Sequence, residues 1–197
     1  MPAHWWEPYI DVVPLWFRTY LASEPTASHI RTYESQYIPG LFQTPAYSRA
    51  VFELAYTDPE EIVRRVELRQ ARQRLLDQPA SPSIQAVITQ DAIIQPPLSP
   101  RERRAQVDRL IALTERPDIT ILITGSAGDV SPPPDSAFTI LHFAEPDLPD
   151  LVYVERADDG QYLDDPAEVA LYSGIIDAMA ESAGTTHDLL HRMRAHI

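Results

Sequence analysis

Several charged side chains in this sequence adjoin apolar segments, where a carboxylate or guanidinium can become buried and chemically active. Glu155 directly follows the apolar run Leu151-Val-Tyr-Val and is the best candidate for a partly buried carboxylate. Arg69 and Arg72 lie three residues apart on an expected helix. Both could face Glu34 or Glu155 within a buried polar network. The alternative is that they pair with nearby glutamates or cover apolar surface with their stems.

Such groups could supply hydrogen bonds or proton transfer to a small molecule without a metal. No two carboxylates have a diagnostic spacing, so the catalytic residues stay unknown; the candidates are Glu155, Asp91, Tyr47 and Glu34. The sequence lacks a Gly-rich phosphate loop, a G-x-S-x-G nucleophile motif and an H-E-x-x-H zinc motif. We therefore expect no cofactor.

Metal binding is the less favoured interpretation of the histidines and acidic residues. His187 and His191 are four residues apart and would share a helix face, but no third ligand is near in sequence. The segment 158–160 is typical of a turn, and Asp165 is typical of a helix N-cap. The absence of cysteine excludes disulfides, thiolate metal sites and a cysteine nucleophile. We expect no metal site.

The segment Ile38–Pro45 combines a turn with the start of a helix. Pro39 restricts its own φ and Gly40 tolerates positive φ, so the chain can reverse there. Thr44 before Pro45 is a good N-cap with proline at the first helical position. The polar and aromatic side chains of this region are the first candidates for an edge that faces a ligand or partner: Phe42, Gln43, Thr44 and Tyr47.

Aromatic residues are concentrated near the N-terminus, where 12 of the 17 lie within residues 1–56. One interpretation is that bulky side chains anchor short helices to the rest of the fold. The other is an aromatic-lined pocket or partner groove, and the two are compatible. The candidate ligand contacts from this part are Trp16 and Tyr33, together with Arg69 and Arg72 from the helix that follows.

The chain has a formal net charge of −13, and all 16 of its basic residues are arginines. A protein this acidic lacks a general phosphate-neutralising surface, so we expect no direct nucleic-acid binding. No segment resembles a signal peptide, and no apolar run is long enough to span a membrane. The sequence therefore predicts a soluble cytoplasmic protein with no membrane partner.

Capping patterns and β-branched runs predict the secondary structure. Proline preceded by a capping side chain indicates helices over about 58–77, about 100–116 and from Asp165 onward, with a last helix from near Thr186. Strands are predicted over 84–89, 119–124, 138–143 and 151–155. The proline-rich loop 125–137 between two strands is expected to be exposed or to form a lid.

These elements predict an α+β fold with a small mixed or antiparallel sheet of four to five strands packed by helices. We expect a single domain over residues 1–197, with an aromatic helical N-terminal part (1–56) and an α+β core (57–197).

The sequence also resembles a known family, the C-terminal domain of actinobacterial, Streptomyces-type Xre-family helix-turn-helix regulators (domain of unknown function 5753). The central feature is the Pro-Gly-Leu-Phe-Gln-Thr motif with a downstream Arg-x-x-Arg-Gln. The matching residues are Trp16, Phe17, Tyr20, Glu24, Ala27, Ile30–Glu34, Ile38–Thr44, Tyr47–Ala50, Arg69–Gln73, Gln106, Pro117–Ile123, Phe138–Phe143, Val152–Glu155 and Tyr162–Pro166.

The resemblance implies a domain that follows a DNA-binding helix-turn-helix and senses a partner. That helix-turn-helix is missing here, so we expect either a truncated regulator or a stand-alone relative. The first functional hypothesis is a domain that senses a small molecule or a small protein, without DNA binding of its own. The second is a stand-alone, cofactor-independent cyclase or isomerase that holds an apolar, polyketide-like molecule in an aromatic pocket. A homodimer is left open.

Overall fold

A mixed sheet of six strands runs through the centre of the computed structural model, which describes residues 4–125, 136–156, 159–183 and 186–197. Three strands run parallel to one another, and the other three continue the sheet in antiparallel fashion from β1. In spatial order the strands are β3 (Ile119–Thr124), β2 (Ser83–Thr89), β1 (His29–Glu34), β4 (Phe138–His142), β5 (Leu151–Glu155) and β6 (Gly160–Leu163).

The α+β class and the mixed sheet are confirmed, whereas the expected four to five strands are too few. The two strands that sequence patterning missed are β1 and β6. β1 lies inside the part expected to be helical, but it pairs with β2 on one side and β4 on the other. Pairing on both edges outweighs a weak local preference for strand. β6 has only four residues and is held by its pairing with β5.

Helices form the remaining regular structure. Four predicted starts are confirmed by side chains that accept a hydrogen bond from the first turn: Thr44, Asp58, Ser99 and Asp165. At Ser99 the cap is reciprocal, because Glu102 in turn accepts from the Ser99 backbone N–H. The α-helices are α1 (Leu15–Ser23), α2 (Pro45–Glu53), α3 (Pro59–Gln73), α4 (Gln90–Ile94), α5 (Pro100–Thr114), α6 (Pro166–Ser182) and α7 (Thr186–His196).

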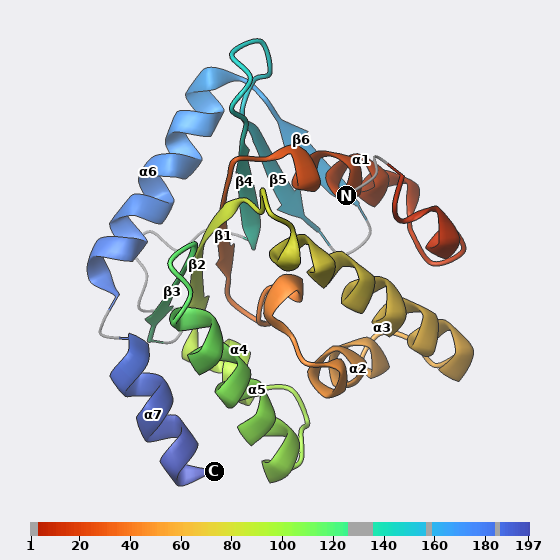
Figure 1. Ribbon diagram of the computed structural model, residues 1–197, viewed down its shortest axis with the longest axis vertical. Helices are drawn as coiled ribbons and strands as arrows, with labels where there is room; N and C mark the ends of the chain where they lie inside the picture. The colour runs from red at the N-terminus through yellow and green to blue at the C-terminus, as the bar shows by residue number, and fades with distance from the viewer. Residues whose placement is uncertain (1–3, 126–135, 157–158, 184–185) are drawn as a thin grey trace.

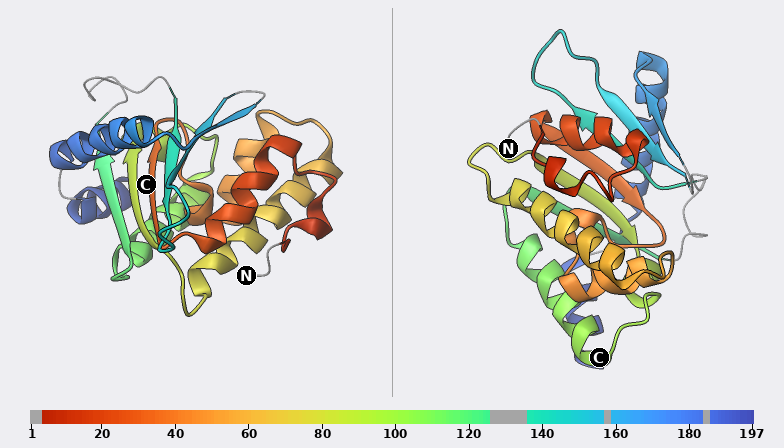
Figure 2. Two further views of the ribbon diagram at one scale, coloured as in Figure 1. Left: turned by 90° about the horizontal axis from the view of Figure 1, so that it is seen from above. Right: turned by 90° about the vertical axis from the view of Figure 1, so that its right-hand side faces the viewer.

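The sheet separates two apolar cores. α6 covers one face and packs over a small cluster that includes Tyr33, Phe138 and Ile176. The other described helices lie on the opposite face or beside it, where a larger cluster extends from Trp6 to Leu190. Figure 1 shows the sheet nearly edge-on with α6 to the left, and the left panel of Figure 2 shows the same layers from above.

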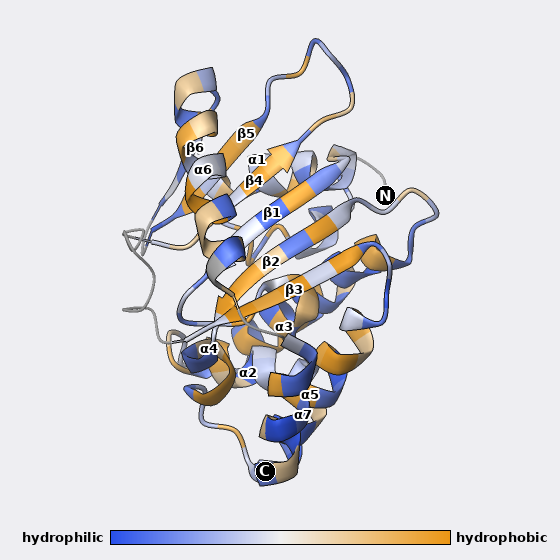
Figure 3. Cartoon of the chain, turned by 90° about the vertical axis from the view of Figure 1, so that its left-hand side faces the viewer, coloured by the Kyte–Doolittle hydropathy of each residue, from blue (hydrophilic) through white to orange (hydrophobic). Residues whose placement is uncertain are grey.

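Strand alternation decides which side chains reach which core. Along β1, Ile30 belongs to the large cluster and Tyr33 to the small one, because successive side chains point to opposite faces. In Figure 3, β1 and β2 show both hydrophobic and hydrophilic residues, whereas β3 is mostly hydrophobic. On the α6 face, Arg31 of β1 forms an ion pair with Asp177 of α6. Thr32 and Glu34 therefore face the side that carries most helices.

No helix among the described residues combines the length and the apolar character needed to cross a membrane. The proline-rich loop that was expected to be exposed or to form a lid lies mostly outside the described residues.

Candidate functional site

A cavity of about 740 Å³ lies between the sheet and α3, on the sheet face opposite α6. This volume is within the range of pockets that bind small molecules. We call it the aromatic cavity because its lining includes eight aromatic side chains: Trp16, Phe17, Tyr20, Tyr37, Phe42, Phe52, Tyr56 and Tyr153.

Each side of the aromatic cavity comes from a different part of the chain. The floor is the sheet, with Thr32 of β1, Thr139 of β4 and Tyr153 of β5. α3 forms the roof, and α1 forms one side. The segment 35–43 closes another side, and residues 51–56 at the end of α2 complete the rim. The aromatic N-terminal residues therefore both anchor α1 and line a pocket, so the two interpretations of their clustering hold together.

The aromatic residues of α1 are positioned by β5 and β6. Tyr162 of β6 donates to the Trp16 carbonyl oxygen at 2.6 Å and accepts from the Tyr20 backbone N–H at 2.9 Å. Tyr153 packs against Tyr20 with ring centroids 4.8 Å apart, and Phe17 stacks on Tyr20 at 5.2 Å. These contacts hold α1 at a fixed height above the sheet and keep the cavity open.

Arg72 of the roof is neutralised by a buried carboxylate. Its Nε and Nη2 donate to the two oxygens of Glu24 at 2.7 and 2.6 Å, and Nη2 also reaches the Tyr20 hydroxyl at 3.2 Å. The Glu24 side chain is 1% exposed. Burial alone would lower the pKa of Arg72, but Glu24 more than offsets it and leaves that pKa raised. Removing one partner of such a buried pair costs about 3–5 kcal/mol.

Arg69, one turn earlier, has no carboxylate in contact. Its Nη1 donates to Gln43 Oε1 at 2.7 Å, and its guanidinium lies over the Phe52 ring at 4.3 Å. Burial, together with the nearby Arg72 charge, lowers the pKa of Arg69 to about 10. A Cβ at Gly40 would stand 3.4 Å from Arg69 Nε and 3.2 Å from Arg72 Nη1. The turn that contains Gly40 therefore approaches both guanidiniums closely.

Two carboxylates, Glu34 and Glu155, stand at the ends of their strands beneath these arginines. Tyr33 pairs with Phe138 and Phe138 with Val154, so the register continued by one residue places Ala137 between the two glutamates. Their Cα atoms are therefore about 10 Å apart, two strand spacings, on the same face of the sheet.

Neither of the two carboxylates makes a hydrogen bond or an ion pair within the described part of the chain. Burial, followed by the charge of Glu155, raises the pKa of Glu34 to about 8 against the opposing effect of Arg69 and Arg72. Burial also raises the pKa of Glu155. The Glu155 residue is nonetheless exposed. The cavity is open to solvent at this residue while protein surrounds the carboxyl group, so the carboxylate that was expected to be partly buried is close to protein and also in contact with solvent.

The Tyr153 hydroxyl is a buried polar group without a hydrogen-bond partner in the described structure. Tyr153 is 3% exposed and lies on the cavity floor two residues before Glu155. Burial raises the pKa of this phenol, with a further contribution from Glu155. A buried hydroxyl left unpaired costs free energy, and a ligand or water in the cavity would relieve it.

The turn at Ile38–Pro45 is held by a dense set of hydrogen bonds. Tyr47 is fully buried; its hydroxyl donates to the Ala92 carbonyl oxygen at 2.5 Å and accepts from the Ile38 N–H at 2.9 Å. Gln43 Nε2 donates to the Ile38 carbonyl oxygen at 2.6 Å. Gln73 Nε2 donates to the carbonyl oxygens of Gly40 and Gln43, each at 2.8 Å. The turn is therefore a rigid side of the cavity.

The structure brings most of the predicted site residues into the lining of the aromatic cavity. These are Trp16, Glu34, Phe42, Gln43, Arg69, Arg72 and Glu155.

Four predicted site residues do not line the cavity. Tyr33 packs beneath α6 on the far face of the sheet. Thr44 caps α2, and the Tyr47 hydroxyl forms its hydrogen bonds with backbone groups. Asp91 lies in the short helix α4. Their proposed contact with a ligand stays a prediction that this placement does not favour.

Sequence reasoning missed Glu24 as the partner of Arg72; it had left open whether Arg72 faces Glu34 or Glu155 or pairs with nearby glutamates. The available signal was the spacing of Tyr20 and Glu24, which are four residues apart and face the same way at the end of α1. It also missed Tyr153 as a lining residue. Alternation along β5 places Tyr153 on the same face as Glu155, so strand periodicity could have found it.

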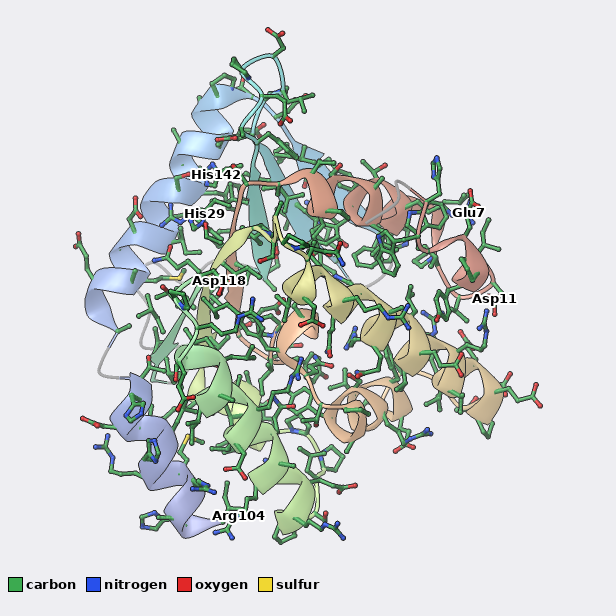
Figure 4. All side chains as sticks on the ribbon, viewed as in Figure 1. Glu7, Asp11, His29, Arg104, Asp118 and His142 are labelled. Carbon is green, nitrogen blue, oxygen red and sulfur yellow. The ribbon has the colours of Figure 1, made fainter. Side chains whose placement is uncertain are left out.

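The structure places the two C-terminal histidines on an exposed helix face. His187 and His191 have Nε2 atoms 3.1 Å apart on α7. Figure 4 labels a second pair, His29 and His142, whose rings stack 5.6 Å apart on β1 and β4. Within the described ranges, no group of three or more histidine, aspartate or glutamate side chains is arranged to hold a metal ion.

Comparison with protein families agrees with the resemblance found in the sequence. The model of the family described as Domain of unknown function (DUF5753) matches residues 17–194. This chain belongs to the DUF5753 family. The match includes all of the lining residues named above except those that precede residue 17. The DUF5753 chain matched no curated protein and no solved structure.

Proposed function

We propose that this DUF5753 chain is a sensing domain that binds a small molecule in the aromatic cavity. The observation that carries the proposal is the cavity itself, which is large enough for a drug-sized ligand and combines eight aromatic side chains with charged groups. Its rigid sides favour a preformed site, which reduces the ordering cost of binding. A small protein partner is the other occupant that the sequence predicts, and a cavity walled by the sheet, α1 and α3 favours a small molecule.

The resemblance to actinobacterial Xre-family regulators supplies the biological setting of the proposal. In that setting the domain derives from a regulator whose DNA reader is a separate helix-turn-helix. This chain, with its net charge of −13, would sense without contacting nucleic acid itself. Release of the small molecule would then change the interaction of the domain with a partner.

The test uses N-phenyl-1-naphthylamine, an uncharged dye whose fluorescence rises in apolar surroundings. We expect saturable binding of one dye per chain. Ala137→Trp would place an indole on the cavity floor and should weaken binding about tenfold or more. The matched control is Ala178→Trp on the exposed side of α6, which should leave binding unchanged. Absence of saturable binding, or equal loss in both variants, would contradict the proposal.

A second candidate function is catalysis by a stand-alone cyclase or isomerase, as the sequence also predicts. The observation that favours it is Glu34, whose pKa of about 8 is close to that of an effective general acid or base at neutral pH. The aromatic lining would hold an apolar substrate beside this carboxyl group.

Proton transfer can be detected without knowing the substrate. The protein is incubated in D2O with a small-molecule extract of its source cells, and mass spectrometry follows deuterium incorporation. The catalytic hypothesis expects a metabolite labelled by the native protein and not by Glu34→Gln. Labelling by neither protein would leave sensing as the function, and equal labelling by both would exclude Glu34 as the group that transfers the proton.

A further inference from the structure

The charged groups around the aromatic cavity do not balance. Arg72 and Glu24 neutralise each other through two short hydrogen bonds. This leaves Arg69 as one cation facing two carboxylates, Glu34 and Glu155, neither of which has an ion-pair partner among the described residues. The set formed by these five side chains, here called the polar wall, therefore carries one excess negative charge when its carboxylates are ionised.

The other arginines of the lining do not remove this imbalance. Arg65 pairs with Glu61, with Nη2 and Oε1 2.7 Å apart. Arg156 is exposed and donates to Gln161 at 2.7 Å. Neither makes a hydrogen bond or an ion pair with Glu34 or Glu155.

The aromatic surface beside the polar wall is suited to a positive charge. Every one of the roof arginines Arg65, Arg69 and Arg72 already lies over an aromatic ring, at 3.8 Å over Tyr56, 4.3 Å over Phe52 and 5.0 Å over Tyr20. Trp16 and Tyr153 line the same cavity without such a cation. Tyr153 packs against Phe17, Tyr20 and Tyr162, so a charged group of a ligand can meet only the part of these two rings that lines the cavity.

We propose that the ligand of the aromatic cavity is a monocationic amine with an apolar, aromatic or aliphatic body, whose ammonium group binds between Glu34 and Glu155. This inference rests on the proposed function, because it names the chemical class of the molecule that the cavity senses. With both carboxylates ionised, an ammonium group there supplies the missing positive charge and donates to carboxylates that have no other donor among the described residues. The Tyr153 hydroxyl, which has no hydrogen-bond partner among the described residues, belongs to the same cavity lining.

Ionisation of the polar wall couples amine binding to pH. The groups that face Glu34 are Glu155 of β5, Arg69 and Arg72 of α3, and Tyr47 of α2. With the pKa of Glu34 at about 8, its carboxyl group binds a proton at neutral pH when the cavity is empty. An incoming ammonium group displaces that proton. Amine binding should therefore release protons and strengthen with rising pH up to the pKa of Glu34.

Three indole probes of similar size separate charge from shape: tryptamine (cation), tryptophol (neutral) and indole-3-propionate (anion). Calorimetric titration of the full chain should give the dissociation constants in that order, with tryptamine about tenfold tighter than tryptophol. Glu34→Gln and Glu155→Gln should remove most of this tenfold preference and leave tryptophol binding unchanged. The matched control, Glu181→Gln on an exposed position of α6, should keep the tenfold preference for tryptamine over tryptophol.

The outcomes distinguish this inference from the proposed function. If the neutral naphthylamine dye binds but tryptamine does not exceed tryptophol, or if indole-3-propionate binds best, the amine inference is overturned and the cavity still binds small molecules. If neither dye nor indole probe binds, both fail. Tryptophol binding also reports folding of the two variants, so an unchanged value excludes loss of structure as the cause of weaker tryptamine binding.

Discussion

Arg69 and Arg72 lie three residues apart on α3, and their positive charges have different hydrogen-bond partners. Arg72 is held by both oxygens of Glu24, whereas Arg69 bonds only the neutral side chain of Gln43. The difference follows from direction, because Arg72 points toward the end of α1 and Arg69 toward the turn before α2. Arg72 thereby joins α3 to the end of α1, and Arg69 remains a cation without an ion-pair partner among the described residues.

Glu34→Gln should stabilise the protein in alkaline solution. The folded pKa of Glu34 is raised from 4.5 to about 8, so its contribution to stability is full below pH 4.5 and is lost as the pH rises to about 8. Glutamine carries no charge at any pH. The variant should therefore match the native protein near pH 4.5 and exceed it by about 1 kcal/mol or more at pH 9. Denaturant unfolding at the two pH values measures this.

The control for that measurement is Glu181→Gln, which removes an exposed carboxylate from α6. Its effect on the free energy of unfolding should be within about 0.5 kcal/mol at both pH values. A Glu34→Gln variant that is less stable than the native protein at pH 9 would show that ionised Glu34 is stabilised by its arginines.

Tyr47→Phe should destabilise the fold without affecting the cavity. The lost hydroxyl leaves the Ala92 carbonyl oxygen and the Ile38 N–H without their partner, at a cost of about 1–3 kcal/mol. The hydroxyl does not line the aromatic cavity, so the dissociation constant of the naphthylamine dye should not change. Thermal unfolding and a dye titration measure the two effects. Weaker dye binding at unchanged stability would place Tyr47 in the binding site instead.

At the scale of elements, the contact of β6 with α1 decides whether the cavity exists. Gly160 begins β6 opposite Glu155, and a Cβ there would stand 2.6 Å from Tyr153 Cε2 and 3.0 Å from Trp16 Cε3. Both neighbours are aromatic rings packed into the cavity lining, so neither can move freely. The glycine thus allows β5, β6 and α1 to meet.

Gly160→Ala should therefore destabilise the protein and disturb the aromatic cavity. Overpacking of this kind costs about 1–3 kcal/mol, and dye binding should weaken as Tyr153 and Trp16 shift. The matched control is Gly174→Ala in α6, where a Cβ meets no atom within 4 Å. That change should stabilise the helix by about 0.5–1 kcal/mol and leave dye binding unchanged. Equal effects of the two substitutions would contradict the assigned role of Gly160.

At the scale of the whole molecule, the net negative charge destabilises the compact folded state. The net charge of −13 produces self-repulsion that salt screens, whereas the buried pair of Arg72 and Glu24 is screened little. Raising sodium chloride from about 0.02 M to about 0.5 M should therefore raise the unfolding midpoint by about 2–4 °C at neutral pH. The same series close to the isoelectric point should show almost no change. A midpoint that falls with salt would mean that attractive pairs dominate.

The layered architecture explains how one chain supports such a cavity. Among the described helices, α6 covers one face of the sheet and packs over the small cluster. On the other face, aromatic contacts with Tyr153 hold α1 over the sheet, and the hydrogen bonds of Arg72 and Gln73 help to hold α3 beside it. The space between is the cavity, and the ligand proposed for it would complete that layer.

The sequence by itself determined the parts of this protein that depend on local chemistry. Capping side chains located α2, α3, α5 and α6, and β-branched runs located β2 to β5, because these signals act between residues close in the chain. The Pro-Gly-Leu-Phe-Gln-Thr motif gave the DUF5753 family, which the match over residues 17–194 confirms.

Only the tertiary structure decided which charges meet. β1 and β6 exist because neighbouring strands pair with them, and that pairing places Glu34 and Glu155 in one row across Ala137. Glu24 reaches Arg72 across 48 residues of chain. Burial requires such pairing, because a charged side chain removed from water is costly unless it binds an opposite charge. The fold determines which opposite charge is close enough. No local pattern carries that information.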